Sequence, residues 1–335
     1  MTDYVRPIAQ VGAVPSSEAL AGGWVRFREV AAGPRDAGPN VIAAKDLPAE
    51  MLQVFTRPRA PWNGLTFDQP LLMGILNVTP DSFSDGGQFD SPDAALEQAR
   101  IIAETCDILD IGGESTRPGA ETVPIDVEIA RTAPVIRAIR EAGLTIPISI
   151  DTRKALVAAA ALDAGATIVN DVSALTFDPN LVRVCAERGV PVILMHAQGT
   201  PQTMQADPRY DDVLLDVYDH LARRIDFACA AGIDADRIAV DPGIGFGKTL
   251  DHNLALLRGM SLFHGLGCPI LLGTSRKGFI GRLGNARNPA DRAPGSIATA
   301  LHAVAQGVQI LRVHDTVATR QALNLWQALT HKPAE

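Results

Sequence analysis

The chain has 335 residues, a formal net charge of −8 and 47% hydrophobic residues, which is enough for a large core in one α/β domain or in two domains. Its mild acidity, without a basic run, argues against nucleic acid as a partner. The N-terminus lacks a signal-peptide pattern and no apolar run is long enough to span a bilayer, so we expect no membrane association. The four cysteines have no CxxC spacing and are typical of reduced thiols in a cytoplasmic protein.

Residues 1–60 predict a small N-terminal α+β appendage of unknown role. Within it, 24–30 alternates like a strand, 33–40 is a loop by its Gly and Pro content, and 48–57 fits a short helix. Residues 58–64 would be the linker, and disorder of the whole segment is the alternative. The segment has no paired acids, anion-binding glycine loop or metal-ligand spacing, so we expect it to take no part in catalysis.

From residue 71 the chain alternates eight times between a short apolar run and an amphipathic stretch. The apolar runs are rich in Val, Ile and Leu, as parallel strands buried on both faces are. They cover 71–76, 107–112, 147–150, 167–170, 191–195, 237–240, 269–273 and 308–313. This pattern predicts an α/β protein in which residues 65–330 form a closed (β/α)8 TIM barrel, with a doubly wound open sheet as the alternative.

Polar or charged residues follow all eight apolar runs, where the carboxyl ends of the strands would meet and where such barrels bind ligands. They include Asn77, Asp151, Asn170, His196, Asp241, Ser275 and His314. One such residue alone is often a helix cap. Because eight of them converge on one end of the predicted barrel, they indicate a functional site.

The stretch DPGIGFGKT at 241–249 is the most distinctive of these strand ends. Pro242 cannot continue a strand, and the glycines that follow would let the backbone approach a flat ligand closely. Gly247-Lys248-Thr249 looks like the end of a phosphate-binding P-loop, but that motif requires glycine where Pro242 stands. We therefore reject a nucleotide-binding loop. A tight strand-to-helix turn without a ligand stays open at this point.

Oxygen and amide groups at these ends suit the edge of a planar, nitrogen-rich ring. Asp151, Asn170 and Asp241 supply acceptors and an amide, and Lys277 adds a donor. Arg312 can lay its guanidinium against a ring face and also reach an anion.

A second group at the same end suits phosphate. Arg117, Arg312 and His314 form a cationic set, and Asn77 is a neutral oxygen ligand of the kind that shares Mg²⁺ with a phosphate and waters. The structural alternatives are solvated loop charges, a core histidine and a turn residue. No zinc-ligand spacing and no nucleophile–His–acid set is evident in the sequence.

Eight segments together resemble the dihydropteroate synthase family of folate biosynthesis. They are LLMGILNVTPDSFSDGG at 71–87, DIGGESTRPGA at 110–120, ISIDTRK at 148–154, IVNDVSA at 168–174, LMHAQGTPQTMQ at 194–205, DPGIGFGKT at 241–249, GTSRKGFIG at 273–281 and LRVHD at 311–315. The family is a transferase that joins 6-hydroxymethyl-7,8-dihydropterin diphosphate to 4-aminobenzoate, giving 7,8-dihydropteroate and pyrophosphate. It is the target of sulfonamides, which mimic 4-aminobenzoate.

The resemblance implies a role for each matching residue. Those that would bind the pterin are Asp151, Asn170, Met195, Asp241, Phe246, Lys277 and Arg312. Those that would bind the diphosphate are Asn77, Arg312 and His314, with Mg²⁺ held through Asn77. Those that would bind 4-aminobenzoate are Phe83, Thr116, Arg117, Pro118 and Ser275. The catalytic residues would be Asp151, Lys277, Arg312 and His314.

The family's mechanism is dissociative: diphosphate leaves first and the arylamine attacks the resulting methylene cation. The residues themselves agree, because anion-binding groups are many and no general base stands out. We expect ordered binding, pterin diphosphate first, and a homodimer through a late barrel helix such as 291–307. The alternatives are a pterin-dependent methyltransferase and a catalytically silent pterin-binding paralogue.

Overall fold

The structure is a computed structural model that describes residues 4–78 and 92–330. Its centre is an eight-stranded parallel sheet in the order β12-β11-β10-β9-β8-β7-β14-β13. A parallel bridge between Val240 and Ile270 joins the two ends of this order, so the sheet closes into a barrel. The strands are β7 (Leu71–Asn77), β8 (Ile108–Gly112), β9 (Ile148–Asp151), β10 (Ile168–Asp171), β11 (Val192–Met195), β12 (Ile238–Asp241), β13 (Leu271–Leu272) and β14 (Ile310–Val313). The predicted TIM barrel is confirmed, and the open-sheet alternative is wrong.

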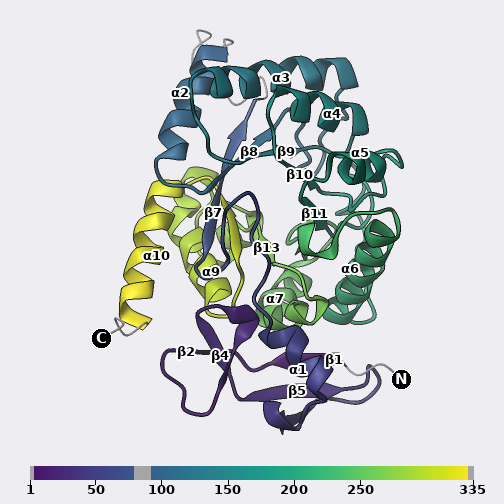
Figure 1. The fold of residues 1–335 in the computed structure, drawn as a ribbon, viewed down its shortest axis with the longest axis vertical. Helices are drawn as coiled ribbons and strands as arrows, with labels where there is room; N and C mark the ends of the chain where they lie inside the picture. The colour runs from purple at the N-terminus through teal and green to yellow at the C-terminus, as the bar shows by residue number, and fades with distance from the viewer. Residues whose placement is uncertain (1–3, 79–91, 331–335) are drawn as a thin grey trace.

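Helices surround this barrel (Figure 1). They are α2 (Pro92–Ala103), α3 (Ile125–Glu141), α4 (Ala155–Ala164), α5 (Leu181–Arg188), α6 (Val213–Ala230), α7 (Leu250–Arg258), α8 (Gly278–Leu283), α9 (Ala293–Val304) and α10 (Thr316–Thr330), with short 3₁₀ turns η4 (Ala235–Arg237), η5 (Met260–Leu266) and η6 (Pro289–Arg292). Their ends follow local chemistry: Thr249 caps α7, and Gly165 ends α4 in the left-handed conformation. Among the described residues, no helix has the length and apolarity to cross a membrane.

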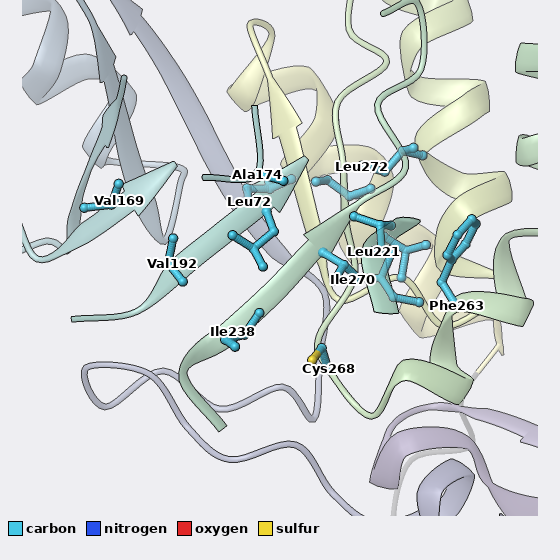
Figure 2. Packing of buried hydrophobic residues seen from close by; sticks show 14 of the residues in the cluster. Leu72, Val169, Ala174, Val192, Leu221, Ile238, Phe263, Cys268, Ile270 and Leu272 are labelled. Atoms are coloured by element: carbon cyan, nitrogen blue, oxygen red, sulfur yellow. The ribbon is translucent and has the colours of Figure 1, made fainter. Parts of the chain in front are cut away.

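Two apolar layers lie on opposite sides of the strands. The outer layer packs strand residues such as Ile238 against the helices, and Figure 2 shows part of it around Leu221 and Phe263. The inner layer fills the amino-terminal half of the barrel with Leu71, Met73, Ile108, Ile168, Ile193, Ala239, Leu271 and Ile310. Trp62 and Phe67 close this layer from below, with their rings edge to face at 5.7 Å. The stretch predicted as a linker therefore places Trp62 in the core.

Residues 4–56 form two antiparallel three-stranded sheets and a helix, which contradicts the alternative of disorder. The elements are β1 (Tyr4–Pro7), β2 (Gln10–Val11), β3 (Glu18–Ala19), η1 (Leu20–Gly22), β4 (Val25–Phe27), β5 (Glu29–Gly33), β6 (Asn40–Ala43), η2 (Ala44–Asp46) and α1 (Ala49–Thr56). The strand expected at 24–30 forms as β4 and β5, and the expected helix forms as α1.

This N-terminal segment covers the amino-terminal end of the barrel, at the lower end of the molecule in Figure 1. Trp24 Nε1 donates to Val304 O over 2.8 Å, and Ser261 Oγ donates to Pro7 O over 2.7 Å. Both partners lie just before a barrel strand, at the end opposite the polar strand ends. Trp24 also belongs to the buried cluster that includes the outer layer of the barrel. The segment therefore stabilises the barrel from the side that faces away from the predicted site.

Candidate active site

On β8, β10, β12 and β14 the barrel interior changes from apolar to polar toward the carboxyl end of the strand. Side chains two positions apart on a strand face the same way. Two residues after members of the inner apolar layer come Asp110, Asn170, Met195, Asp241, Gly273 and Arg312, and Asp151 lies beside Asn170 in the sheet. We call Asp110, Asp151, Asn170, Asp241 and Arg312 the polar layer. It lies at the carboxyl ends of the strands, as the sequence predicted for a ligand site.

Arg312 joins two carboxylates across this layer. Its Nε donates to Asp110 Oδ2 over 2.6 Å, and its Nη2 donates to Asp151 Oδ2 over 2.8 Å. Burial alone would lower the pKa of Arg312, but the two carboxylates outweigh it and the pKa is raised. For Asp151 burial is also the largest cause, and it raises the pKa although the charge of Arg312 opposes the shift. The guanidinium is therefore charged and fixed in place before any ligand binds.

Asp110 is the residue that the sequence reasoning missed. It is 0% exposed within β8, and Asn170 Nδ2 lies 3.4 Å from each of its carboxylate oxygens. In the sequence it lies inside the apolar run 107–112, and the prediction gives it no role. A signal was present, because an acid inside an apolar run is expensive to bury unless a partner or a ligand compensates it.

Asp241 uses its two oxygens differently. Its Oδ1 accepts a hydrogen bond from Gly243 N over 2.7 Å, and its Oδ2 lies near Gly273, inside the barrel. Burial raises the pKa of Asp241, and the charge of Lys277 opposes the shift. Burial also lowers the pKa of Lys277 to about 8. One oxygen therefore holds the following turn while the other is placed for a ligand.

Lys277 and Phe246 lie together above Asp241. Lys277 Nζ is 4.6 Å from the centre of the Phe246 ring and donates to Ile244 O. Met195 lies beneath the same turn, with its Cγ 3.3 Å from the position that a Cβ on Gly243 would take. The structure thus brings all seven residues assigned to the pterin to one end of the barrel.

Two of the glycines after Asp241 allow close packing against a neighbouring loop. Gly243 has φ +69°, and a Cβ there would lie 1.8 Å from His196 O; a Cβ on Gly247 would lie 2.5 Å from Gln198 O. At these two positions the close approach is to the neighbouring loop. The approach of this turn to a flat ligand stays a prediction. Lys248 is buried, with Nζ 2.8 Å from His196 Nδ1, which agrees with our rejection of a P-loop.

His314 lies beside Ser275 at the end of β14. Ser275 Oγ accepts from the backbone N of His314 over 3.1 Å and lies 3.0 Å from its Nδ1. Burial lowers the pKa of His314 to about 3, and the charges of Arg312, Arg276 and Arg117 add to the effect. The imidazole is therefore neutral at neutral pH, so its place in the predicted cationic set is wrong and it can serve an anion only as a neutral donor. If the Ser275 hydroxyl donates to Nδ1, the ring carries its proton on Nε2, and this N–H can donate a hydrogen bond to an anion.

The remaining predicted residues lie around the rim. Asn77 ends β7 and is paired in register with Gly112, which is paired in turn with Asp151. Thr116, Arg117 and Pro118 lie on the loop between β8 and α3, whose Gly119 N donates to Pro201 O over 2.8 Å. Ser275 contacts His314 and not this loop, so its assignment to 4-aminobenzoate stays a prediction. Phe83 lies outside the described residues.

Comparison with known proteins identifies the family. The model for the pterin binding enzyme family matches residues 73–314. A dihydropteroate synthase from Synechocystis sp. is 45% identical over 84% of this chain and 98% of its own length. This chain belongs to the dihydropteroate synthase family. The transferase activity and the fold that the sequence predicted are confirmed.

Solved structures agree with this assignment. A dihydropteroate synthase from Xanthomonas albilineans with 4-aminobenzoic acid has a TM-score of 0.77 at 46% identity, over 82% of this chain and 99% of that chain. Another, in complex with 7,8-dihydropteroate, has a TM-score of 0.73 at 43% identity, over 80% and 97%. Both of these structures hold molecules that the family resemblance connects with the reaction.

Proposed function

We propose that the polar layer binds the pterin of 6-hydroxymethyl-7,8-dihydropterin diphosphate and that diphosphate leaves before 4-aminobenzoate attacks. The observation that carries this proposal is the buried set of Asp110, Asp151, Asn170 and Asp241 at the strand ends, two of which are joined by the partly buried Arg312. Carboxylates and an amide in a barrel interior need compensating polar partners, and a planar ring with several N–H groups supplies them. Lys277 would donate to an acceptor on the same ring, and Arg312 would stack against its face.

Two arginines and a neutral histidine at this end of the barrel suit the leaving diphosphate. Arg312 is held charged, Arg117 lies close enough to lower the pKa of His314, and His314 Nε2 can donate to an anion. Stabilising the negative charge that develops on the leaving group lowers the barrier to its departure. We find no side chain placed as a general base among the described rim residues, and an uncharged arylamine does not require one to attack a cation.

Asn77 fits Mg²⁺ that is shared with a substrate. The described residues contain no group of three or more His, Cys, Asp or Glu that could hold a metal alone. Mg²⁺ in phosphate-handling enzymes commonly takes one or two protein oxygens and completes its shell with phosphates and waters. The amide oxygen of Asn77, at the end of β7, matches such a single neutral ligand. When bound, the ion would neutralise charge on the diphosphate.

A direct assay tests the assignment of the pterin site. The chain, both substrates and Mg²⁺ should give 7,8-dihydropteroate and pyrophosphate in equal amounts. Asp241→Asn should weaken pterin binding by about 1.5–3 kcal/mol, because it replaces an acceptor by a donor facing a ring that also donates. Unchanged pterin affinity in calorimetric titration would remove Asp241 from the site.

The dissociative step has its own test. The substrate is pterin diphosphate labelled with ¹⁸O in the bridge between the pterin methylene and the α-phosphorus. If the C–O bond breaks reversibly, the label should move into non-bridging oxygens of the α-phosphate when the chain and Mg²⁺ are present without 4-aminobenzoate. Absence of this exchange, together with normal turnover once 4-aminobenzoate is added, would favour a concerted displacement.

Ordered binding can be measured at equilibrium. Asp151, Asn170 and Asp241 lie at the ends of barrel strands, whereas the residues assigned to 4-aminobenzoate at 116–118 lie on a loop. A ligand that binds better to one arrangement of this loop shifts the loop toward that arrangement. Pyrophosphate with Mg²⁺ should therefore strengthen the binding of 4-aminobenzoate, and it should strengthen the binding of sulfonamides in the same way. Equal 4-aminobenzoate affinity with and without pyrophosphate would contradict the proposed order.

We also propose a cytoplasmic homodimer. The four cysteines are free thiols, as a reducing compartment favours. Helix α9, within 291–307, packs beside α10, which exposes Val317, Leu325 and Leu329 along one face. This apolar face supports a contact with a second copy of the chain. Light scattering after size-exclusion chromatography should give twice the mass of one chain, and Leu325→Glu should lower this value to the mass of one chain.

A further inference from the structure

Four buried charged side chains lie at the base of the loop that carries Thr116, Arg117 and Pro118. We call them the charged cluster: Glu114, Glu128, Arg153 and Lys154, with exposed fractions of 8%, 1%, 7% and 4%. Two acids and two bases balance in charge. Buried charges are retained where partners satisfy them, and here each acid is paired with Lys154. Because these charges are buried and paired, backbone groups that form hydrogen bonds with them are held in place.

Glu114 joins the two ends of this loop. Its Oε2 accepts a hydrogen bond from Val123 N over 2.8 Å. Lys154 Nζ donates to the same carboxylate and to Val123 O, the latter over 2.6 Å. Residues 115–122 therefore form a loop whose ends are held together by one carboxylate and one ammonium group.

The same cluster attaches the loop to the polar layer. Arg153 and Lys154 follow Asp151 in the chain by two and three residues. Arg153 Nε lies 3.1 Å from Glu114 Oε1, and its Nη2 donates to Thr122 Oγ1 over 3.2 Å. These bonds therefore fix the position of the loop relative to the end of β9, which carries Asp151.

Glu128 belongs to the cluster but acts on the side of helix α3. It accepts from Thr152 Oγ1 over 2.7 Å and from Lys154 Nζ. Glu114 bonds to the backbone of the loop, whereas Glu128 bonds to the segment after β9. The two acids thus share Lys154 and a buried setting but differ in what they hold, which makes Glu128 a matched control.

We propose that Glu114 is a positioning residue for 4-aminobenzoate, which acts by fixing the loop that carries Thr116, Arg117 and Pro118. The inference rests on the proposed placement of 4-aminobenzoate against that loop. A weak neutral nucleophile gains most from being held in line with the reacting carbon, so the geometry of its pocket matters to the rate. The loop must then be placed before the second substrate arrives.

Glu114→Gln tests this with the least change of shape. Val123 N and Lys154 Nζ both donate to the same carboxylate oxygen, Oε2. A glutamine offers one oxygen and adds two N–H donors, so it cannot serve both the Oε1 and the Oε2 partners. We expect the KM for 4-aminobenzoate to rise about tenfold or more, while the KM for pterin diphosphate stays within about twofold.

Two further variants keep the test decisive. Glu128→Gln should leave the KM for 4-aminobenzoate near the wild-type value, even where it lowers the melting temperature. Thr122→Val, at an exposed position, should raise that KM in the same direction by a smaller factor, and it serves if Glu114→Gln does not fold.

The outcomes separate this inference from the proposed function. An unchanged KM for 4-aminobenzoate in Glu114→Gln, an equal rise in both KM values, or the same rise in Glu128→Gln would each overturn the role of Glu114. Thr116→Ala reports on the loop itself. If Thr116→Ala leaves 4-aminobenzoate binding unchanged, the proposed placement of that substrate fails, and the inference fails with it.

Discussion

Arg312 Nε lies 2.6 Å from Asp110 Oδ2, and the carboxylate that it contacts is 0% exposed. This contact joins β14, the last barrel strand, to β8, the second, and it fixes the orientation of the guanidinium plane. A side chain that must both stack on a ring and reach an anion needs such a fixed orientation, because an arginine carries much rotamer freedom. Asp110 is therefore part of the pterin site through the residue that it holds.

We predict that Asp110→Asn weakens binding of pterin diphosphate by about 1.5–3 kcal/mol, since one charged hydrogen bond to Arg312 is lost. Calorimetric titration of the ligand in the presence of Mg²⁺ measures this directly. Asp107→Asn is a matched control, because Asp107 also pairs with an arginine, Arg320, and accepts from Leu72 N at the start of β7. Equal effects of the two variants would show a general loss of stability and no specific role for Asp110.

The anion site predicts a difference between two ligands. His314→Ala should weaken the binding of pterin diphosphate by about 1–3 kcal/mol and leave the binding of free 6-hydroxymethylpterin almost unchanged. The reason is that only the diphosphate would accept a hydrogen bond from Nε2. Arg312→Ala should weaken both ligands, the diphosphate more, since it would lose stacking and charge together. Equal weakening of both by Arg312→Ala would leave stacking as its role.

Ser275→Ala then separates the two roles open to Ser275. If Ser275 orients His314, the variant should resemble a mild form of His314→Ala in the same titrations. A raised KM for 4-aminobenzoate with normal binding of the diphosphate would instead support the role that family resemblance implies for Ser275.

The barrel could be predicted from the sequence because eight apolar runs of the right length each ended in a polar residue. The site was harder to predict than the barrel, and each residue that was missed or misinterpreted has a physical reason. Asp110 is hidden in a strand, since strand periodicity shows which face a residue takes and not which partner lies across a barrel. The glycines at 243 and 247 showed close approach, but the sequence does not say that the neighbour is the loop after β11. The neutral state of His314 depends on burial and on the charges of nearby arginines, of which Arg276 and Arg117 come from other segments of the chain.

The N-terminal segment should matter for stability and not for chemistry. Trp24 is 8% exposed and its indole donates to Val304 O. Trp24→Ala should lower the free energy of unfolding by about 3–5 kcal/mol, measured by urea denaturation, while pterin affinity at low temperature stays the same. Val41→Ala, at a position that is 60% exposed in the same segment, is the control.

A shortened chain beginning near Leu65 tests the same segment more severely. The sequence analysis gave the segment no catalytic role, so activity should survive its removal if the product stays soluble. The structure adds that removal uncovers the residues that pack on Trp24, Phe27 and Phe55 and takes Trp62 out of the inner apolar layer, so we expect a lower melting temperature. A folded but inactive product that still binds pterin would show that residues 1–60 complete the site or the dimer.

The lowered pKa of Lys277 predicts an alkaline limb in the pH dependence. Burial shifts that pKa to about 8 in the free protein, so the ammonium that would donate to the pterin is lost as the pH rises through about 8. The kcat/KM for pterin diphosphate reports free-enzyme groups and should fall there. Stability should not explain the fall: the unfolded chain binds more protons at this lysine than the folded chain between about pH 8 and 10, so this group's contribution to stability rises with pH. Lys277→Arg keeps its charge, and its kcat/KM, although lower, should lose this limb. An identical alkaline limb in Lys277→Arg would assign it to another group and remove the ammonium of Lys277 from pterin binding.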